Sequence, residues 1–277
     1  MLNQRMLDKI ICNALEEDVF RGDLTTEMTI PEENMSRAII KVKAPGIICG
    51  LEVVKRVFEI VDPSIVFIQV IEEGGQVEVG DIAAKLEGNT KSLLTGERTA
   101  LNFLQRMSGI ATLTRLFCDK TKGTKARIVD TRKTAPGLRL LDKYAVVCGG
   151  GTNHRYCLAD GILIKDNHIK AAGGIKDALK AVKGKVPHTL KIEIETSTLS
   201  EVREAIEEGA DIIMLDNMTV DEMKEAVRLI NGKAIVEASG NVSIENVNQI
   251  AFAGVDVISI GALTHSVEAM DISMKIE

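Results

Sequence analysis

The sequence predicts an α/β protein: an incomplete β/α barrel preceded by a smaller α+β domain of the open-sandwich kind. Short apolar runs rich in β-branched residues recur through the second half of the chain. From the third run onward they fall about every 22 residues, the repeat length of a β/α unit. Helical patterns such as 199–210 and 220–233 separate them. The runs are mostly apolar on both faces, which is typical of parallel strands covered by helices.

Only six strand-like runs are visible, whereas a full barrel has eight, so we expect a short barrel. The runs cover residues 126–130, 161–165, 190–195, 210–216, 234–239 and 255–261. Between the fourth and the fifth run, Met223, Val227 and Ile230 share one helical face. Gly209 and Gly232 follow the two helical patterns at the position where a positive φ is often needed.

The first half of the chain lacks the regular β/α repeat of the second half, and this difference predicts a separate domain. Residues 2–16 suggest an amphipathic helix, and a longer helical stretch covers about 92–118. Three strand-like segments joined by glycine turns lie between them, at 37–50, 65–77 and 81–88. We therefore place an α+β domain at 1–112 and the barrel at 113–263. The alternating segment 264–277 is expected to return to the first domain as an edge strand.

Composition narrows the class of function. A net charge of -6, no Trp and two Tyr disfavour a nucleic-acid surface, which needs a basic stripe with stacking aromatic side chains. No apolar run approaches the ~20 residues of a membrane span, and the first residues lack the apolar core of a signal peptide. The five cysteines form no Cys-x-x-Cys pair, so neither a zinc site nor a disulfide framework is indicated. We expect a cytoplasmic protein with no nucleic-acid or membrane partner.

Polar residues stand at the carboxyl ends of the predicted strands. In order along the chain they are Arg132 with Lys133, Lys165, Glu195, Asp216, Glu237 with Ser239, and Gly261. In a β/α barrel these ends meet at the face where active sites lie. A single charged strand end carries little information, but six together predict a site.

The residue types at this face suit a small polyanion. Arg132, Lys133, Arg139, Arg155 and Lys165 offer forked and point-charge donors for carboxylates and phosphates. Small-residue turns follow the last two strands, at the barrel positions where backbone N–H groups commonly hold a phosphate. These turns are Ser239-Gly240-Asn241 and Ile260-Gly261-Ala262. Glu195 and Asp216 add carboxylates for sugar hydroxyls, a divalent cation or a developing positive charge.

Several longer motifs resemble those of the quinolinate phosphoribosyltransferase family. They are TRKTAPGLR (131–139), GGGTNHR (149–155) and LADGILIKDNHI (158–169), together with EDVFRGDLTTE (17–27), GERTALNFLQRMSGIAT (96–112) and EASGNVS (237–243). The resemblance covers nearly the whole chain. It implies transfer of a phosphoribosyl group from 5-phosphoribosyl-1-pyrophosphate to quinolinate with loss of carbon dioxide. The products are nicotinate mononucleotide, for NAD synthesis, and pyrophosphate, and the family requires Mg²⁺.

The resemblance also implies residue roles. Arg132, Arg155 and Lys165 would bind the quinolinate carboxylates, with Thr131 and His154 beside them. Lys133 would contact the phosphoribosyl donor, and Glu195 and Asp216 would hold ribose hydroxyls and Mg²⁺. The 5'-phosphate would lie against Ser239, Gly240, Asn241, Ile260, Gly261 and Ala262, with His265 nearby. Arg98 would enter the site of the neighbouring subunit in a homodimer, or in a hexamer built from such dimers.

Two other functions fit parts of the pattern. A Schiff-base aldolase could use Lys165 on a barrel strand with Glu195 as its acid or base. That reading explains neither the cations nor the two small-residue turns. A non-catalytic protein on the same scaffold would tolerate loss of Glu195 or Asp216, yet both are present. His168 is compatible with a functional part or with holding a loop.

Overall fold

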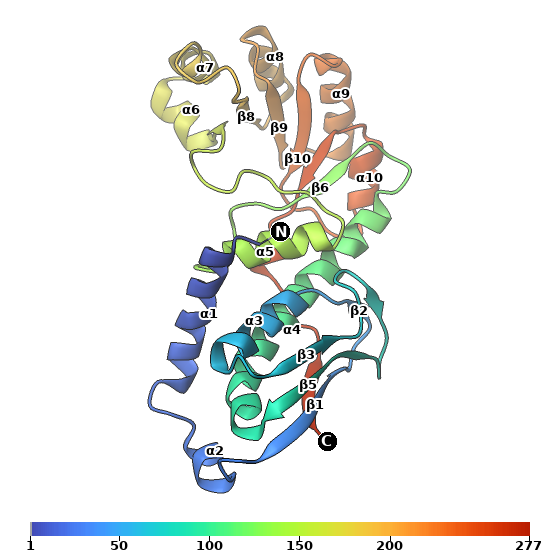
Figure 1. Cartoon of the computed structure of the whole chain (residues 1–277). Helices are drawn as coiled ribbons and strands as arrows, with labels where there is room; N and C mark the ends of the chain where they lie inside the picture. The colour runs from blue at the N-terminus through green and yellow to red at the C-terminus, as the bar shows by residue number, and fades with distance from the viewer. Residues whose placement is uncertain (1) are drawn as a thin grey trace. The chain divides into compact units, whose positions relative to one another are not determined.

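The computed structural model describes residues 2–277, and the chain divides into two compact units (Figure 1). The first unit contains a four-stranded antiparallel sheet. This unit contains residues up to 115, 134–150 and 263–277. Its sheet has the order β12-β1-β5-β3. The strands are β1 (Met35–Val42), β3 (Val66–Gln69), β5 (Ile82–Asn89) and β12 (Ile272–Ile276), and β2 (Gly46–Ile47) pairs separately with β4 (Gln76–Val77).

Helices supply the rest of this unit. They are α1 (Gln4–Val19), α2 (Leu24–Thr29), α3 (Leu51–Val61), α5 (Arg139–Cys148), α11 (Ala262–His265) and most of α4 (Thr90–Lys120). The Asn3 side chain accepts a hydrogen bond from the Met6 N–H and so begins α1. Ala38, Ile40 and Val42 are buried on alternate positions of β1, so this sheet buries one face. The predicted helices near 2–16 and 92–118 are confirmed as α1 and α4.

The chain's last strand belongs to this first sheet, as its alternating pattern predicts. β12 lies antiparallel to β1, with Ile276 opposite Ala38 and Ile272 opposite Val42. The division into units places 134–150 with the first unit, although the sequence predicts it inside the barrel. The other unit boundaries fall at 115/116 and 262/263, close to the predicted 112/113 and 263/264.

A six-stranded parallel sheet forms the second unit, residues 116–133 and 151–262. Its order is β6-β11-β10-β9-β8-β7. The strands are β6 (Arg127–Val129), β7 (Ile162–Ile164), β8 (Ile192–Thr196), β9 (Ile212–Asp216), β10 (Ile235–Ser239) and β11 (Val257–Ser259). The helices between them are α6 (Asp166–Ala172), α7 (Ile175–Val182), α8 (Leu199–Glu207), α9 (Val220–Ile230) and α10 (Val247–Phe252).

This order is that of a barrel short of two units, so the predicted incomplete β/α barrel is confirmed. The first strand pairs with the last, while β6 and β7, which are consecutive in sequence, are the two edges of the sheet. Capping boxes begin α8 and α9, where Thr198 and Thr219 bond to the backbone three residues on and Glu201 and Glu222 bond back. Gly209, directly after the C-cap residue of α8, takes φ 66°, the conformation that the sequence predicts there.

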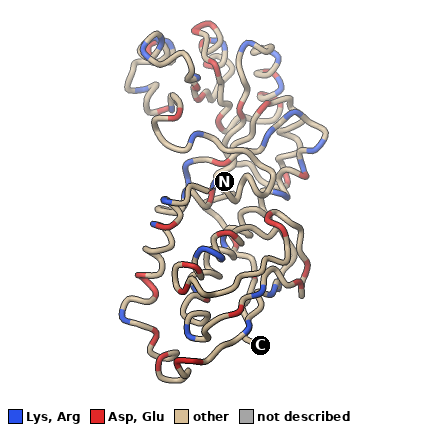
Figure 2. Tube along the Cα trace, in the orientation of Figure 1, with Lys and Arg blue, Asp and Glu red and all other residues tan. Residues whose placement is uncertain are grey.

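Charged residues of both signs are interspersed along both units (Figure 2). None of the helices in the described part of the chain combines the length and the apolar character that crossing a membrane requires.

Gly109 on α4 makes a prediction about packing in the first unit. A Cβ atom at this position would lie well inside contact distance of the Glu268 carbonyl oxygen, and backbone cannot move aside as a flexible side chain can. We expect Gly109→Ala to lower the free energy of unfolding by about 1–3 kcal/mol. Urea unfolding measures this change. Asn102→Ala, at an exposed position of the same helix, is the control and should stay within about 0.5 kcal/mol of wild type; an equal effect of both changes would contradict the packing argument.

Candidate active site

The carboxyl ends of the central barrel strands bring several predicted site residues to one edge. β9 and β10 are in register, with Asp216 opposite Ser239. β8 lies on the other side of β9, and Glu195 pairs with Met214 there. Lys165 follows β7, the neighbour of β8. Lys165, Glu195, Asp216 and Ser239 therefore stand at the ends of four adjacent strands.

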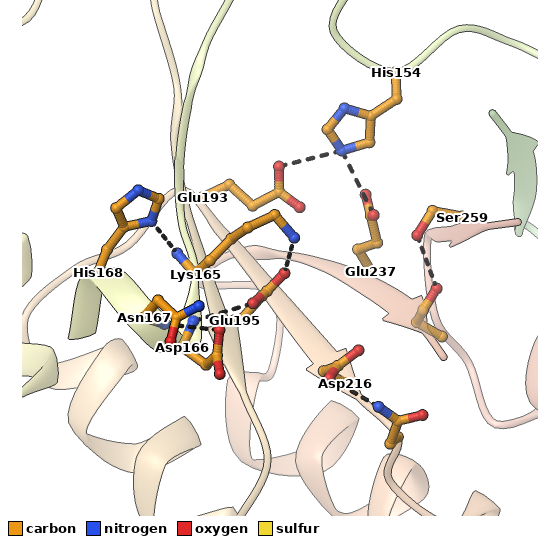
Figure 3. Close-up of polar contacts among 12 residues, drawn as sticks. His154, Lys165, Asp166, Asn167, His168, Glu193, Glu195, Asp216, Glu237 and Ser259 are labelled. Atoms are coloured by element: carbon orange, nitrogen blue, oxygen red, sulfur yellow. Dashed lines mark hydrogen bonds and ion pairs between the residues drawn. The ribbon is translucent and has the colours of Figure 1, made fainter. Parts of the chain in front are cut away.

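Lys165 and Glu195 form an ion pair at this edge. The Lys165 Nζ lies 2.5 Å from Glu195 Oε1, and the Asp166 N–H donates to Glu195 Oε2 at 3.2 Å (Figure 3). The Lys165 side chain is 48% exposed, whereas that of Glu195 is 13% exposed. Both carboxylate oxygens of Glu195 are thus held, and the exposed ammonium of Lys165 is available to an anionic ligand.

His168 has a structural role in the adjoining helix start. The Lys165 N–H donates to His168 Nδ1 at 2.9 Å, at the N-terminus of α6. This bond favours the loop-holding interpretation of His168 over a part in catalysis. It also fixes the backbone from which the Lys165 side chain extends.

Asp216 lies near the charge of Glu195. Burial, followed by the negative charge of Glu195, raises the pKa of the Asp216 carboxyl above its ordinary value. A hydrogen bond from Asn217 and the charges of Lys165 and Lys133 act in the opposite direction. Two carboxylates that repel each other favour a cation or a developing positive charge between them.

The turn after β10 is built from residues with positive φ. Gly240 has φ 88° and Asn241 has φ 51°, while Asn217 after β9 has φ 57°. The Asn217 N–H donates to the Ser239 carbonyl at 2.9 Å, and the Asn241 side-chain amide donates to Asn217 Oδ1 at 2.9 Å. A Cβ at position 240 would collide with the Asn217 side chain, so only glycine fits there. These hydrogen bonds therefore connect the turn after β9 to the turn after β10.

The second small-residue turn follows β11. The Ile260 N–H donates to the Val129 carbonyl at 3.0 Å, which ties this turn to β6. Ile260 is buried, and Gly261 and Ala262 are half-buried as the chain enters α11. The predicted phosphate turns thus follow two neighbouring strands, β10 and β11.

The cations of the TRK motif lie directly after β6. The Lys133 N–H donates to Thr131 Oγ1 at 3.0 Å, which forms a tight local turn. Arg132 is half-buried and Lys133 is exposed. Burial, followed by the nearby positive charge of Arg132, lowers the pKa of the Arg155 guanidinium. The charge of Arg132 thus acts on Arg155, and an anionic ligand would offset that repulsion.

His154 is held by carboxylates on two sides. Its Nε2 lies 3.4 Å from Glu193 Oε2 and 3.6 Å from Glu237 Oε1, and its backbone N–H donates to Asp130 Oδ1 at 2.9 Å (Figure 3). Burial disfavours a charged ring, but hydrogen bonds and negative charge from Glu193 and Glu237 outweigh it and raise the pKa of His154 to about 10.

The two ring nitrogens of His154 are under different influences. The Arg155 backbone N–H donates to His154 Nδ1 at 2.8 Å, which requires a lone pair on that nitrogen. A fully charged ring carries a hydrogen on Nδ1 and would lose this bond. The carboxylates therefore favour a hydrogen on Nδ1, whereas the Arg155 N–H favours a lone pair there. Nε2 carries a hydrogen in both charge states. The hydrogen on Nε2 is therefore the fixed feature of this ring.

Sequence reasoning missed Glu193 and treated Glu237 only as a strand end. The signal was present in LKIEIE (190–195), where Glu193 and Glu195 alternate with isoleucines. Residues two apart on a strand point to the same face, and an acid inside a buried strand calls for a partner. Asp130, which is fully buried, was likewise not assigned to the site.

Three predicted residues belong to the first unit. Arg98 is exposed on α4, and His265 is exposed at the end of α11, where its Nδ1 lies 2.7 Å from Ser266 Oγ. Arg139 begins α5 and donates from Nε to Thr134 Oγ1 at 3.1 Å. The residues that the barrel unit itself brings together are Thr131, Arg132, Lys133, His154, Arg155, Lys165, Glu195, Asp216 and the two turns.

Family models match both parts of the chain. The N-terminal domain of quinolinate phosphoribosyl transferase matches residues 23–108, and the C-terminal domain of the same family matches residues 110–275.

Curated relatives and solved structures agree with this match. The chain is 47% identical over 283 residues to the Nicotiana tabacum quinolinate phosphoribosyltransferase [decarboxylating] 2a, mitochondrial, covering 95% of this chain and 80% of the relative. It is 41% identical over 275 residues to the probable nicotinate-nucleotide pyrophosphorylase [carboxylating] of Bacillus subtilis, covering 99% and 95%. The crystal structure of NadC from Streptococcus pyogenes superposes with a TM-score of 0.96 at 37% identity, covering 100% of this chain and 98% of that one.

The raised pKa of His154 predicts how stability changes with pH. Because the folded-state pKa of about 10 exceeds the ordinary value of 6.5, protonation stabilises the fold fully below about pH 6.5. That contribution is lost as the pH rises toward 10. Between pH 6.5 and about pH 10, we expect the free energy of unfolding of His154→Gln to fall less than that of wild type. Urea unfolding at several pH values measures this difference. His188→Gln, at an exposed position, should follow wild type. Parallel curves for wild type and His154→Gln would contradict the raised pKa.

Proposed function

We propose residue roles for the reaction of the quinolinate phosphoribosyltransferase family, to which this chain belongs. The chain is a decarboxylating quinolinate phosphoribosyltransferase of de novo NAD synthesis. It transfers the phosphoribosyl group of 5-phosphoribosyl-1-pyrophosphate to quinolinate. The products are nicotinate mononucleotide, pyrophosphate and carbon dioxide.

Quinolinate would bind to the cations around the edge strands β6 and β7. The observation that carries this assignment is that burial, followed by the positive charge of Arg132, lowers the pKa of the Arg155 guanidinium, a cost that a bound anion would relieve. The exposed ammonium of Lys165 supplies a further donor. Thr131 and His154 would lie beside the bound dicarboxylate. Two carboxylates on adjacent ring atoms match such a set of forked and point-charge donors.

The phosphoribosyl donor would lie across the ends of β8 to β11. Lys133 would contact the donor, and Glu195 and Asp216 would face its ribose. The 5'-phosphate would be held by backbone N–H groups of the turns at 239–241 and 260–262, whose small residues allow close approach. The interlocked positive-φ turn of Gly240 and Asn241 keeps this binding surface rigid. His265 would approach the same phosphate.

The chemistry depends on charge placement. As the bond to pyrophosphate breaks, positive charge develops at the ribosyl carbon, and the carboxylates of Glu195 and Asp216 stabilise it. The pyridine nitrogen of quinolinate forms the new bond and becomes cationic. The adjacent carboxylate then leaves as carbon dioxide, and the ring carbon that kept its electron pair takes a proton. No nucleophilic side chain is needed, so orientation and electrostatics carry the reaction.

Mg²⁺ fits the donor set at Glu195 and Asp216. Both are carboxylates, the ligands that this hard cation prefers, and burial, followed by the negative charge of Glu195, raises the pKa of the Asp216 carboxyl. Two carboxylates leave most of an octahedral shell to water and to substrate oxygens. Bound there, Mg²⁺ would neutralise the departing pyrophosphate.

The family membership overrules the aldolase alternative, which the Lys165–Glu195 contact alone would not exclude. The family membership likewise overrules a purely non-catalytic scaffold. A cytoplasmic location stays a prediction.

The arginines of the proposed quinolinate site make a direct prediction. We expect Arg132→Ala and Arg155→Ala to raise the KM for quinolinate about 10- to 100-fold, because charge-assisted hydrogen bonds are lost. The KM for the phosphoribosyl donor should change much less. Carbon dioxide release from carboxyl-labelled quinolinate, with donor and Mg²⁺, measures both constants. Arg203→Ala, at an exposed position of α8, is the control. An unchanged quinolinate KM in both variants would remove these arginines from the site.

Arg98 makes a prediction about assembly, because we propose a homodimer in which each Arg98 completes the partner's site, alone or within a hexamer. Arg98→Ala and Lys165→Ala should each be nearly inactive. After equal mixing and subunit exchange, half of the dimers would be mixed, and one site in each would be intact. We expect activity of about a quarter of wild type. No recovery, with exchange proven by native mass spectrometry, would place Arg98 in its own subunit's site or outside any site.

A further inference from the structure

Two buried glutamates inside the barrel have no role in the reaction as described. Glu193 on β8 is 4% exposed and Glu237 on β10 is 3% exposed. Barrel interiors are usually filled by branched apolar side chains, and a buried carboxylate is costly unless it has a partner. Glu193 Oε1 has no hydrogen-bond partner among residues 2–277. These acids therefore need an explanation beyond packing.

Their position separates them from the reacting groups. Glu193 precedes Glu195 by two residues on β8, so both point to the same face, with Glu193 one layer nearer the amino end of the strand. A cavity of about 460 Å³ opens beside Glu193, Glu237 and His154. Its other charged lining residues are Arg127, Arg155, Asp160 and Lys191. Arg127 begins β6, and Lys191 immediately precedes β8, so this cavity extends toward the amino ends of the strands.

Both glutamates reach the same atom of a proposed substrate-binding residue. Their carboxylates lie 3.4 and 3.6 Å from His154 Nε2, and they come from two strands that flank β9 (Figure 3). The opposite edge of the ring is also occupied, because His154 Nδ1 accepts the backbone N–H of Arg155 at 2.8 Å. A connected path therefore runs from the two carboxylates through the imidazole to the backbone of Arg155.

The path ends at a guanidinium whose orientation matters. Arg155 donates from its NH1 nitrogen to the Gly161 carbonyl at 3.0 Å, and burial together with the charge of Arg132 disfavours its own charge. Because burial and the charge of Arg132 make the charged form of Arg155 unfavourable, the segment that carries Arg155 needs anchors. Asp130 supplies one by accepting the His154 backbone N–H at 2.9 Å. The imidazole supplies the other.

We propose that Glu193 and Glu237 are positioning residues for quinolinate binding, which hold the imidazole of His154 through Nε2 and thereby hold the segment that carries Arg155. They do not touch the substrate. The proposal rests on the assignment of Arg155 to the quinolinate site. In this proposal, residues inside the barrel contribute to quinolinate binding in addition to the residues at the strand ends.

The same three side chains could instead bind a cation. Their ligand atoms all lie within 4.8 Å of one another. Separations of 3.4 and 3.6 Å between Nε2 and the carboxylate oxygens are ion-pair distances, which a protonated His154 ring explains without a metal ion. We therefore favour the positioning role and make metal content a deciding measurement.

The kinetic test compares two substitutions at each glutamate. Leucine removes the acceptor, whereas glutamine keeps one acceptor oxygen and removes the charge. We expect Glu193→Leu and Glu237→Leu to raise the KM for quinolinate more than about 10-fold, and the glutamine variants about 3- to 10-fold. The KM for the phosphoribosyl donor should stay within about twofold of wild type. Asp256→Asn, which alters a carboxylate bonded to Val236 N–H and Lys125, controls for general loss of barrel stability.

A spectroscopic readout tests the ring directly. The chain has four histidines, so ¹⁵N-labelled histidine gives few signals, and His154→Gln identifies the one that matters. We expect hydrogen on His154 Nε2 in wild type, and a His154 ring that loses its charge at a lower pH in the Glu193→Leu/Glu237→Leu double variant, because the two carboxylates that raise its pKa are gone. If the leucine variants do not fold, the wild-type spectrum and the glutamine variants decide.

Each outcome supports or overturns a stated part. Unchanged quinolinate KM in folded variants, or hydrogen only on Nδ1 in wild type, overturns the positioning role. One metal ion per chain in the purified enzyme that is absent from the variants also overturns it and identifies a metal site. Arg155→Ala distinguishes failure of the proposed quinolinate site from failure of the positioning role. If this variant leaves the quinolinate KM unchanged, the proposed quinolinate site itself is wrong. If Arg155→Ala raises that KM but the glutamate variants do not, only the positioning role fails.

Discussion

Carboxylates buried inside a parallel barrel are the constraint on which the site depends. Glu193 and Glu237 have almost no contact with solvent, and Glu195 and Asp216 are partly buried above them. A carboxylate that loses water must find a cation or a hydrogen-bond donor, or its charge becomes costly. The donors seen at His154 and Lys165 do not lie on the strands. The donors must come from the segments that follow the strands.

Those segments are ordered by the acids that they neutralise. His154 comes from the segment between β6 and β7 and is held by Glu193 and Glu237, while Lys165 follows β7 and is held by Glu195. Each pairing joins a loop residue to a strand residue, which gives the loop the rigidity of the sheet. The substrate-binding cations thus owe their placement to acids that lie beneath them.

Rigidity at the other side of the site has a different source. The turns after β9 and β10 interlock through Asn217, Gly240 and Asn241, all with positive φ. The Asn241 side-chain amide bonds to the Asn217 side chain between these turns. The absence of a Cβ at Gly240 lets the two turns come close together. One side of the mouth therefore depends on ion pairs, and the other on backbone geometry. A reaction governed by orientation and electrostatics needs both.

The sequence by itself determined the order of the elements, the parallel barrel strands and the polar residues that close them. Those features are local: periodicity, capping residues and turn residues are legible over ten or twenty positions, and Lys165, Glu195 and Asp216 could be found because each ends a strand. The motifs around Arg132 and Arg155 also pointed to the family. Only the tertiary structure decided that His154 lies between Glu193 and Glu237, which are 39 and 83 residues away in sequence. It likewise placed the segment 134–150, which contains Arg139, with the first unit. Such pairings depend on which strands become neighbours, and periodicity within one segment carries no information about its partners.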